Sequence, residues 1–211
     1  VTGDRPPLQL APLELEPLLQ ELIIELKLLA DDRRISLALD VVPVPTISAD
    51  AQWLKQALIN LLDNGLKYTP PGGSVTVRLR RSDGSLEIAV RDTGPGIEAE
   101  HVPFLFDRFY RVAGSGQQGC GLGLSIVARI AGLHGGSVAF EDGAGKTGFT
   151  VIVTMPVAGR GGTDERAGNR PWRTAHRPQN ASPMVGTSVP KASGVNGSRA
   201  AASGVSTGSC G

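Results

Sequence analysis

Residues 54–69, LKQALINLLDNGLKYT, decide how the whole chain is interpreted. A helix turns by about 100° per residue, so this stretch has two different faces. One face is a broad apolar arc that we expect to pack on a core: Leu54, Leu58, Leu61, Leu62 and Leu66. The opposite face is polar, because residues three, four and seven positions apart lie together: Asn60, Asp63, Asn64 and Lys67. Asparagines in a helix interior are unfavourable, since their amides compete with the backbone for hydrogen bonds. The pattern fits either an ordinary amphipathic surface helix or a helix with a functional polar face.

The patterns on either side of this helix predict further helices and strands. Upstream, the spacing of apolar residues predicts a helix from Leu13 to Ala30, and alternation predicts a strand over residues 35–40. Asp50 supplies the N-cap of the central helix, which we expect to end near Tyr68. Downstream we expect a hairpin, a short helical segment, a helix and two closing strands: 74–80, 85–92, from about 98, 122–134, 137–142 and 148–156.

The two ends of the chain lack such patterns. Residues 1–12 are rich in proline and are expected to form an extended linker. From residue 158 onward the composition is dominated by Gly, Ser, Ala, Pro and Arg. A segment of this kind cannot bury enough apolar surface to offset its chain entropy, so we expect residues 158–211 to be disordered. One domain is therefore predicted, over residues 13–157.

Composition narrows the class of protein. The 211 residues carry a formal net charge of +1, which gives no electrostatic reason to expect binding to nucleic acid or to an anionic membrane. The two cysteines, Cys120 and Cys210, do not suggest a disulfide framework, so a reduced, cytoplasmic setting is the default. We find no apolar run long enough to cross a bilayer and no signal-peptide pattern. The chain begins without Met, and we expect it to be a fragment of a longer protein.

Two glycine motifs follow the central helix. The first, Asp92-Thr-Gly-Pro-Gly96, comes after a strand, and its glycines would let the backbone approach a ligand while the carboxylate accepts a hydrogen bond from an exocyclic amine. The second, Gly119-Cys-Gly-Leu-Gly-Leu124, runs into a helix whose N-terminal N–H groups suit phosphate oxygens. Taken alone, the first motif is also compatible with a simple loop, and the second with a hinge and helix start.

Four motifs in sequence carry a family resemblance. They are Asn60-Leu-Leu-Asp-Asn-Gly-Leu-Lys-Tyr-Thr69, the two glycine motifs and, between them, Phe106-Asp-Arg-Phe-Tyr-Arg111. In this order they resemble the nucleotide-binding domain of bacterial sensor histidine kinases, over about residues 13–157. The wider family also contains type II topoisomerases, mismatch-repair proteins and heat-shock chaperones. The resemblance implies an α+β fold, a two-layer α/β sandwich of the Bergerat type, with a mixed and mostly antiparallel sheet covered on one face by helices.

The resemblance also implies ATP and Mg²⁺ as cofactors and assigns roles to residues. Asn60 would hold the Mg²⁺, Asn64 and Lys67 would contact the phosphates, and Tyr68 would lie against the nucleotide. Asp92 would bind the adenine amino group. The loop from Ala113 to Gly119 would be a mobile lid anchored by Phe106 and Phe109. The remaining nucleotide-binding residues implied by the resemblance are Gly94, Gly96, Ile97, Phe109, Gly119, Gly121, Leu122, Gly123, Leu124 and Thr147.

Asn60 and Lys67 are the catalytic residues that the resemblance implies. ATP-hydrolysing relatives carry a glutamate as general base at the position of Asn60, and an amide cannot serve as that base. Phosphoryl transfer to another acceptor is therefore expected, with positioning and charge neutralisation supplying most of the catalysis. One departure from the kinases is Gly65, where they usually carry alanine; it should loosen the helix by up to about 1 kcal/mol.

A second departure is that no acceptor histidine is found. Of the three histidines, His101 and His134 are expected to pack or to cap a helix, and His176 lies in the tail. The expected partners are therefore ATP, a histidine-bearing dimerisation domain upstream in a homodimeric full-length protein, and a response regulator. No nucleic acid is expected, and any membrane contact would come through upstream segments. The alternatives are an anti-sigma-factor-like serine kinase of the same fold and a non-catalytic nucleotide-binding module.

Overall fold

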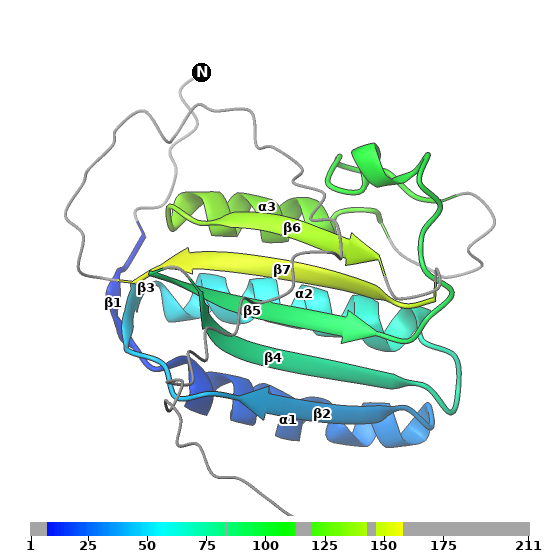
Figure 1. Cartoon of the computed structure of the whole chain (residues 1–211), viewed down its shortest axis with the longest axis horizontal. Coiled ribbons are helices and arrows are strands. Elements are labelled where there is room, and N and C mark those ends of the chain that lie inside the picture. Colours follow the sequence, from blue (N-terminus) through cyan, green and yellow to red (C-terminus); the bar gives the residue numbers. More distant parts are fainter. Residues whose placement is uncertain (1–7, 83, 113–119, 143–146, 158–211) are drawn as a thin grey trace, which may run out of the picture. The chain divides into compact units, whose positions relative to one another are not determined.

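A five-stranded sheet forms one layer of the computed structural model, which describes residues 8–82, 84–112, 120–142 and 147–157 (Figure 1). The spatial order of its strands is β2 (Ser36–Val41), β4 (Ser74–Ser82), β5 (Ser85–Asp92), β7 (Phe149–Pro156) and β6 (Ser137–Asp142). β2 runs parallel to β4, and the other neighbours are antiparallel. The predicted hairpin is confirmed, with Val75 opposite Asp92 and Ser82 opposite Ser85.

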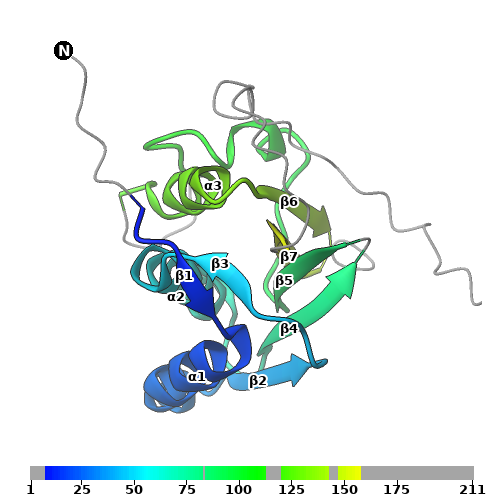
Figure 2. The same ribbon diagram turned by 90° about the vertical axis from the view of Figure 1, so that its left-hand side faces the viewer.

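Three helices cover one face of this sheet: α1 (Leu15–Asp32), α2 (Ala51–Tyr68) and α3 (Gly123–Leu133). Viewed from the side, all three lie on the same side of the strands, with α2 between α1 and α3 (Figure 2). Alternate residues of the strands face the helices and are buried with them in one core, among them Val77, Ile88 and Val153. The predicted fold class, a two-layer sandwich with a mixed and mostly antiparallel sheet, is confirmed.

The central helix begins and ends where the sequence predicts. Asp50 is its N-cap, and Oδ1 accepts hydrogen bonds from the N–H groups of Gln52 (3.1 Å) and Trp53 (3.2 Å). At the other end Thr69 donates its hydroxyl to the carbonyl of Gly65 at 2.7 Å. All the leucines of the predicted apolar arc are buried: Leu54, Leu58, Leu61, Leu62 and Leu66. Caps at both ends and a buried stripe together account for this helix.

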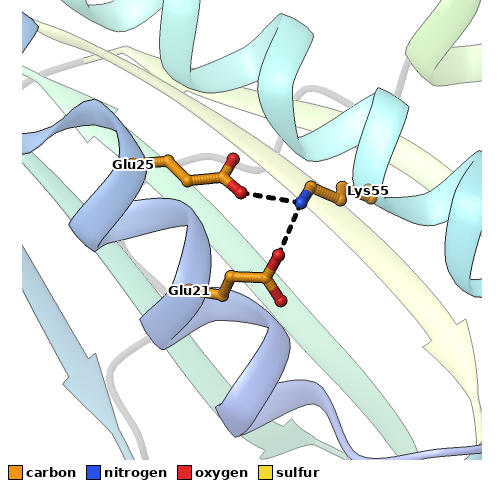
Figure 3. Close-up of polar contacts among 3 residues, drawn as sticks. All are labelled: Glu21, Glu25 and Lys55. Carbon is orange, nitrogen blue, oxygen red and sulfur yellow. Dashed lines mark hydrogen bonds and ion pairs between the residues drawn. The ribbon is translucent and has the colours of Figure 1, made fainter.

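An ion-pair cluster joins α1 to α2. Lys55 of α2 places its Nζ between Glu21 (2.7 Å) and Glu25 (2.9 Å) of α1 (Figure 3). The hydrogen bond from Lys55 lowers the pKa of the Glu21 carboxyl below its ordinary value. Because these side chains are partly exposed, water and salt screen the attraction, and the cluster sets the alignment of the two helices more than it adds stability.

Two features depart from the predicted elements. A small antiparallel sheet joins β1 (Ala11–Leu13) to β3 (Ile47–Ala49), and three-residue strands are too short to show an alternating pattern. The N–H of Gln9 also donates to Oδ2 of Asp50 at 2.8 Å, which ties this part of the chain to the start of α2. The short helix expected from about Glu98 is instead a single 3-10 turn, η1 (Val102–Phe104), which contains Pro103.

Two of the predicted segments cannot be compared with the structure. The tail at residues 158–211 and the lid at residues 113–119 lie outside the described residues. Within the described residues, none of the helices combines the length and the apolar character that crossing a membrane requires.

The packing of α2 yields a direct test. Leu62 is completely buried, whereas Leu28 of α1 is 81% exposed. Leu62→Ala should lower the free energy of unfolding by about 2–5 kcal/mol, because it leaves a cavity beneath the sheet-facing side of α2. Leu28→Ala is the matched control and should change it by about 0.5 kcal/mol or less. Urea denaturation of both variants checks this, and similar losses in the two would contradict the assigned face.

Candidate functional site

The polar face of α2 meets the first turn of α3. A Cβ added at Gly123, the first residue of α3, would lie 3.2 Å from Nδ2 of Asn64 and 3.7 Å from Oδ1 of Asn60. The Nδ2 group of Asn60 donates to the carbonyl of Gln56 at 3.0 Å, so its amide nitrogen is engaged within the helix. The oxygen is then the atom of Asn60 that can accept a ligand or a cation. The structure thus brings together residues that are about sixty positions apart.

A second close approach joins the end of α2 to the end of β5. A Cβ added at Gly94 would lie 2.8 Å from the carbonyl oxygen of Tyr68 and 2.9 Å from Oδ1 of Asp92. Asp92 accepts a hydrogen bond at this same oxygen from the N–H of Gly94, at 2.8 Å. Glycine is therefore required at position 94 by the space available, because any side chain would push α2 and the carboxylate apart.

The Asp92 carboxyl is partly buried at this junction. Burial raises its pKa above the ordinary value, and the hydrogen bonds from the backbone N–H groups of Gly94 and Phe149 offset only part of that effect. Its ionised form is disfavoured because water is excluded from it. A ligand that donates a hydrogen bond to this oxygen pair would recover part of the lost solvation.

Gly148 completes the junction, and the sequence analysis did not identify it. Its backbone is left-handed (φ 82°), and its N–H donates to the carbonyl of Gly94 at 2.7 Å. A Cβ there would lie 2.5 Å from the carbonyl oxygen of Asp92. The only signal in the sequence is one glycine between Thr147 and a strand, which is a common arrangement. Thr147 precedes Gly148 in the chain and is exposed.

The second glycine motif forms the start of α3. Leu122 occupies the N-cap position, and its side chain makes no hydrogen bond to the helix. The N-cap side chain therefore leaves the first N–H groups of α3 uncovered. Gly121 has a left-handed backbone (φ 67°), and its carbonyl accepts the N–H of Phe109 at 2.8 Å. This backbone contact brings the segment before residues 113–119 next to the segment after them. Gly119 lies outside the described residues.

The other predicted residues surround these contacts or support them. Lys67 is half-buried, with Nζ 5.5 Å from the centre of the Tyr68 ring, and Tyr68 is 40% exposed. Gly96 has a left-handed backbone (φ 80°), and Ile97 and Leu124 pack against the core. Phe106 is buried against Phe140, whereas Phe109 is 70% exposed and has φ 66°, which is rare for a bulky residue.

Both described histidines have structural partners, as expected. His134 ends α3; its Nδ1 lies 2.8 Å from the carbonyl of Ile130, and its Nε2 accepts the N–H of Asp50 at 3.0 Å. This pattern requires a neutral imidazole with its proton on Nδ1. His101 contacts the Tyr110 hydroxyl at 2.8 Å.

Comparison with known proteins shows the family to which this chain is similar. The profile of a family described as "Histidine kinase-, DNA gyrase B-, and HSP90-like ATPase" matches residues 49–159. The adaptive-response sensory kinase SasA of Synechococcus elongatus is 39% identical over 145 residues, which are 67% of this chain and 37% of SasA. The histidine protein kinase DivJ of Caulobacter vibrioides is 48% identical over 114 residues, 53% of this chain and 19% of DivJ. The chain thus spans well under half the length of these curated relatives.

Solved structures give the same result. Full-length ShkA in complex with AMPPNP matches with a TM-score of 0.65 and 32% identity, over 72% of this chain and 32% of ShkA. The mycobacterial sensor histidine kinase MprB matches with a TM-score of 0.59 and 32% identity, over 70% of this chain and 97% of the MprB chain. Both matches thus extend over about seven tenths of this chain.

The raised pKa of Asp92 predicts a pH-dependent effect on stability. A raised folded-state pKa means that the ionised carboxylate costs stability at neutral pH and that this cost disappears as the pH falls to about 4. Asp92→Asn should therefore melt at a higher temperature than the parent at pH 8, and the difference should shrink as the pH is lowered. Asp63→Asn makes the same chemical change at an exposed position of α2 and is the control. A difference that grows toward low pH would contradict the burial of Asp92.

Proposed function

Because this chain belongs to the family of histidine kinase-, DNA gyrase B- and HSP90-like ATPases, we propose that residues 13–157 are the catalytic domain of a sensor histidine kinase. The domain would bind Mg-ATP and transfer the γ-phosphoryl group to a histidine on a separate dimerisation domain in two-component signalling. The observation that carries this proposal is the close approach of Gly123 to the amides of Asn60 and Asn64, since it puts a helix start suited to an anion beside an amide oxygen suited to a cation.

The phosphate end of the site lies between α2 and the start of α3. The first N–H groups of α3 and the positive end of its dipole attract phosphate oxygens. Asn64 and Lys67 supply further donors from α2, and Lys67 neutralises charge as a compact cation. Gly121, Leu122, Gly123 and Leu124 would then contact the phosphates mainly through backbone.

The residues present fit a magnesium ion held mostly by the nucleotide. Mg²⁺ prefers oxygen ligands and usually keeps several waters and substrate phosphates in its shell. Asn60 offers its amide oxygen, because its amide nitrogen already donates a hydrogen bond to the carbonyl of Gln56. A neutral amide also adds no negative charge beside a triphosphate. When bound, the ion would neutralise charge on the β- and γ-phosphates and orient them for transfer.

The adenine end is assigned to the junction around Asp92. The half-buried carboxylate can accept a hydrogen bond from the exocyclic amine of adenine, a donor that guanine does not present at that position. Gly94 and Gly148 let the neighbouring backbone pack closely around Asp92. Gly96, Ile97 and Thr147 would contact the base. Tyr68 would lie along the nucleotide between its two ends.

Asn60 also bears on the reaction type. An amide has no basic site to remove a proton from water, so the domain has no general base at this position for hydrolysis. In the proposed transfer, the γ-phosphorus loses its bond to the oxygen bridging to ADP and gains a bond to an imidazole nitrogen of the acceptor. The acceptor histidine, the partner copy of a homodimer and a response regulator would all be supplied by segments or proteins beyond these 211 residues.

Asp92→Asn tests the base pocket. The side-chain NH₂ of Asn would oppose the adenine amine, and we expect the affinity for AMPPNP to fall at least about tenfold, or about 1.4 kcal/mol. Isothermal titration calorimetry measures the affinity, with Asp63→Asn as the control for a lost charge. Because the same variant is expected to be at least as stable as the parent, loss of folding would not explain the result. Parental affinity in Asp92→Asn would refute the assignment.

Asn60→Ala tests the metal role. We expect the affinity for AMPPNP to fall about tenfold in the presence of Mg²⁺ and to be nearly unchanged in EDTA, because the lost oxygen acts through the ion. Gln56→Ala, one turn earlier on the exposed side of α2, should resemble the parent in both conditions. Equal losses with and without Mg²⁺ would show that Asn60 contacts the nucleotide directly or only maintains the helix.

A further inference from the structure

A basic hollow lies next to the proposed nucleotide site. It has a volume of about 530 Å³ and is bounded by the end of α1, the end of α2 and the turns that follow them; its lining is Asp32, Arg33, Arg34, Leu66, Lys67, Thr69 and Pro71. The two turns are bonded to each other, because Gly72 donates its N–H to the carbonyl of Arg34 at 2.8 Å and Ser36 donates to Gly73 at 2.9 Å. The hollow is therefore a built feature of the fold.

Positive charge dominates this hollow. It holds three cationic side chains, Arg33, Arg34 and Lys67, against the single carboxylate of Asp32. Within the part of the chain that the structure describes, neither Arg33 nor Arg34 forms an ion pair. Three cations beside one carboxylate attract an anionic ligand and raise its association rate at low salt.

The backbone at Arg34 helps to form the edge of the hollow. Arg34 has φ 57°, in the left-handed region where glycine or asparagine is more favourable. Its N–H donates to the carbonyl of Asp31 at 2.9 Å, so this conformation closes the turn that ends α1. The next N–H, that of Ile35, donates to the carbonyl of Ala30 at 2.8 Å, and many helices end with such a left-handed residue. The turn places an arginine, instead of the more usual glycine, in the lining of the hollow.

The hollow is distinct from the proposed phosphate site and shares only Lys67 with it. Leu66 lines the hollow, whereas Asn60 faces the start of α3. The two side chains are separated by about 120° around the axis of α2. Among the described residues of the two glycine motifs, none lines the hollow. An occupant would therefore lie beside the proposed nucleotide site, on the other side of Lys67.

We propose that the Arg33–Arg34–Lys67 hollow is the docking site for an acidic stretch of the protein that receives the phosphoryl group. The inference rests on the proposed function, because that function is what requires a protein acceptor. The charge of the hollow favours carboxylates, and a volume of about 530 Å³ open to the surface leaves room for side chains of a docked segment. Docking here would hold the acceptor near the phosphates without occupying the nucleotide site.

The experiment uses the full 211-residue chain and a ten-residue glutamate peptide as the probe. The test variant is Arg33→Gln with Arg34→Asn, since asparagine tolerates the left-handed backbone and both changes remove charge. The control is Arg81→Gln with Arg129→Gln, which removes the same charge from exposed positions of β4 and α3. Peptide affinity is measured by fluorescence anisotropy at 50 and 200 mM salt, and AMPPNP affinity is measured in parallel by calorimetry.

We expect the test variant to bind the peptide at least fivefold more weakly than the control at 50 mM salt, with both keeping parental affinity for AMPPNP. A photoreactive version of the peptide should cross-link to residues 31–34 and 66–71. Equal peptide affinity in the two variants, or cross-links confined to the basic tail, would overturn the docking site. A matching loss of AMPPNP affinity in the test variant would show that the hollow holds nucleotide phosphates instead. Failure of the parent to bind AMPPNP at all would refute the proposed function and is distinguishable from these outcomes.

Discussion

The burial of one face of α2 is the constraint on which the rest of the structure depends. Leu54, Leu58, Leu61, Leu62 and Leu66 are all nearly inaccessible, and each contributes about 1.5–3 kcal/mol relative to an exposed position. Turning the helix by one residue would rotate it by about 100° and move polar groups under the sheet. The apolar face therefore fixes the direction of Asn60 and Asn64 as firmly as it fixes the core, and the caps at Asp50 and Thr69 fix where the helix begins and ends.

Close approach of backbone segments is the second constraint, and glycine makes it possible. At Gly94, Gly123 and Gly148 an added Cβ would lie 2.5–3.2 Å from a neighbouring segment or a site side chain. Gly94 follows β5, Gly148 precedes β7 and Gly123 begins α3. The sheet holds Gly94 and Gly148 together, because Asp92 lies opposite Phe149 in the register of β5 and β7. A ligand site thus forms at the ends of the elements, where side chains are absent and backbone N–H groups are accessible.

The difference between local signals and long-range contacts explains which features could be predicted from the sequence. The extent of α2 follows from local signals, namely the leucine spacing and Asp50, and both hold in the structure. The contact of Gly123 with Asn64 could be inferred only through family resemblance, because it joins residues 59 positions apart that no local pattern connects. Gly148 was missed since a lone glycine before a strand is uninformative, and β1 and β3 were missed since three residues show no periodicity. The basic hollow could not be foreseen, because it depends on two distant turns being hydrogen-bonded to each other.

Three residues in or near the site lower the stability of the fold. Asp92 keeps a carboxylate where burial raises its pKa, and Arg34 and Phe109 adopt left-handed backbone conformations that cost of order 1–3 kcal/mol each in non-glycine residues. Within the described residues, those are the two non-glycine positions with positive φ, and one adjoins the hollow while the other is bonded to Gly121. A domain optimised only for stability would carry glycine or asparagine at both and a neutral residue at position 92. The leucine core of α2 is what makes such local costs tolerable, so the same packing that orients the site also allows it to be unfavourable.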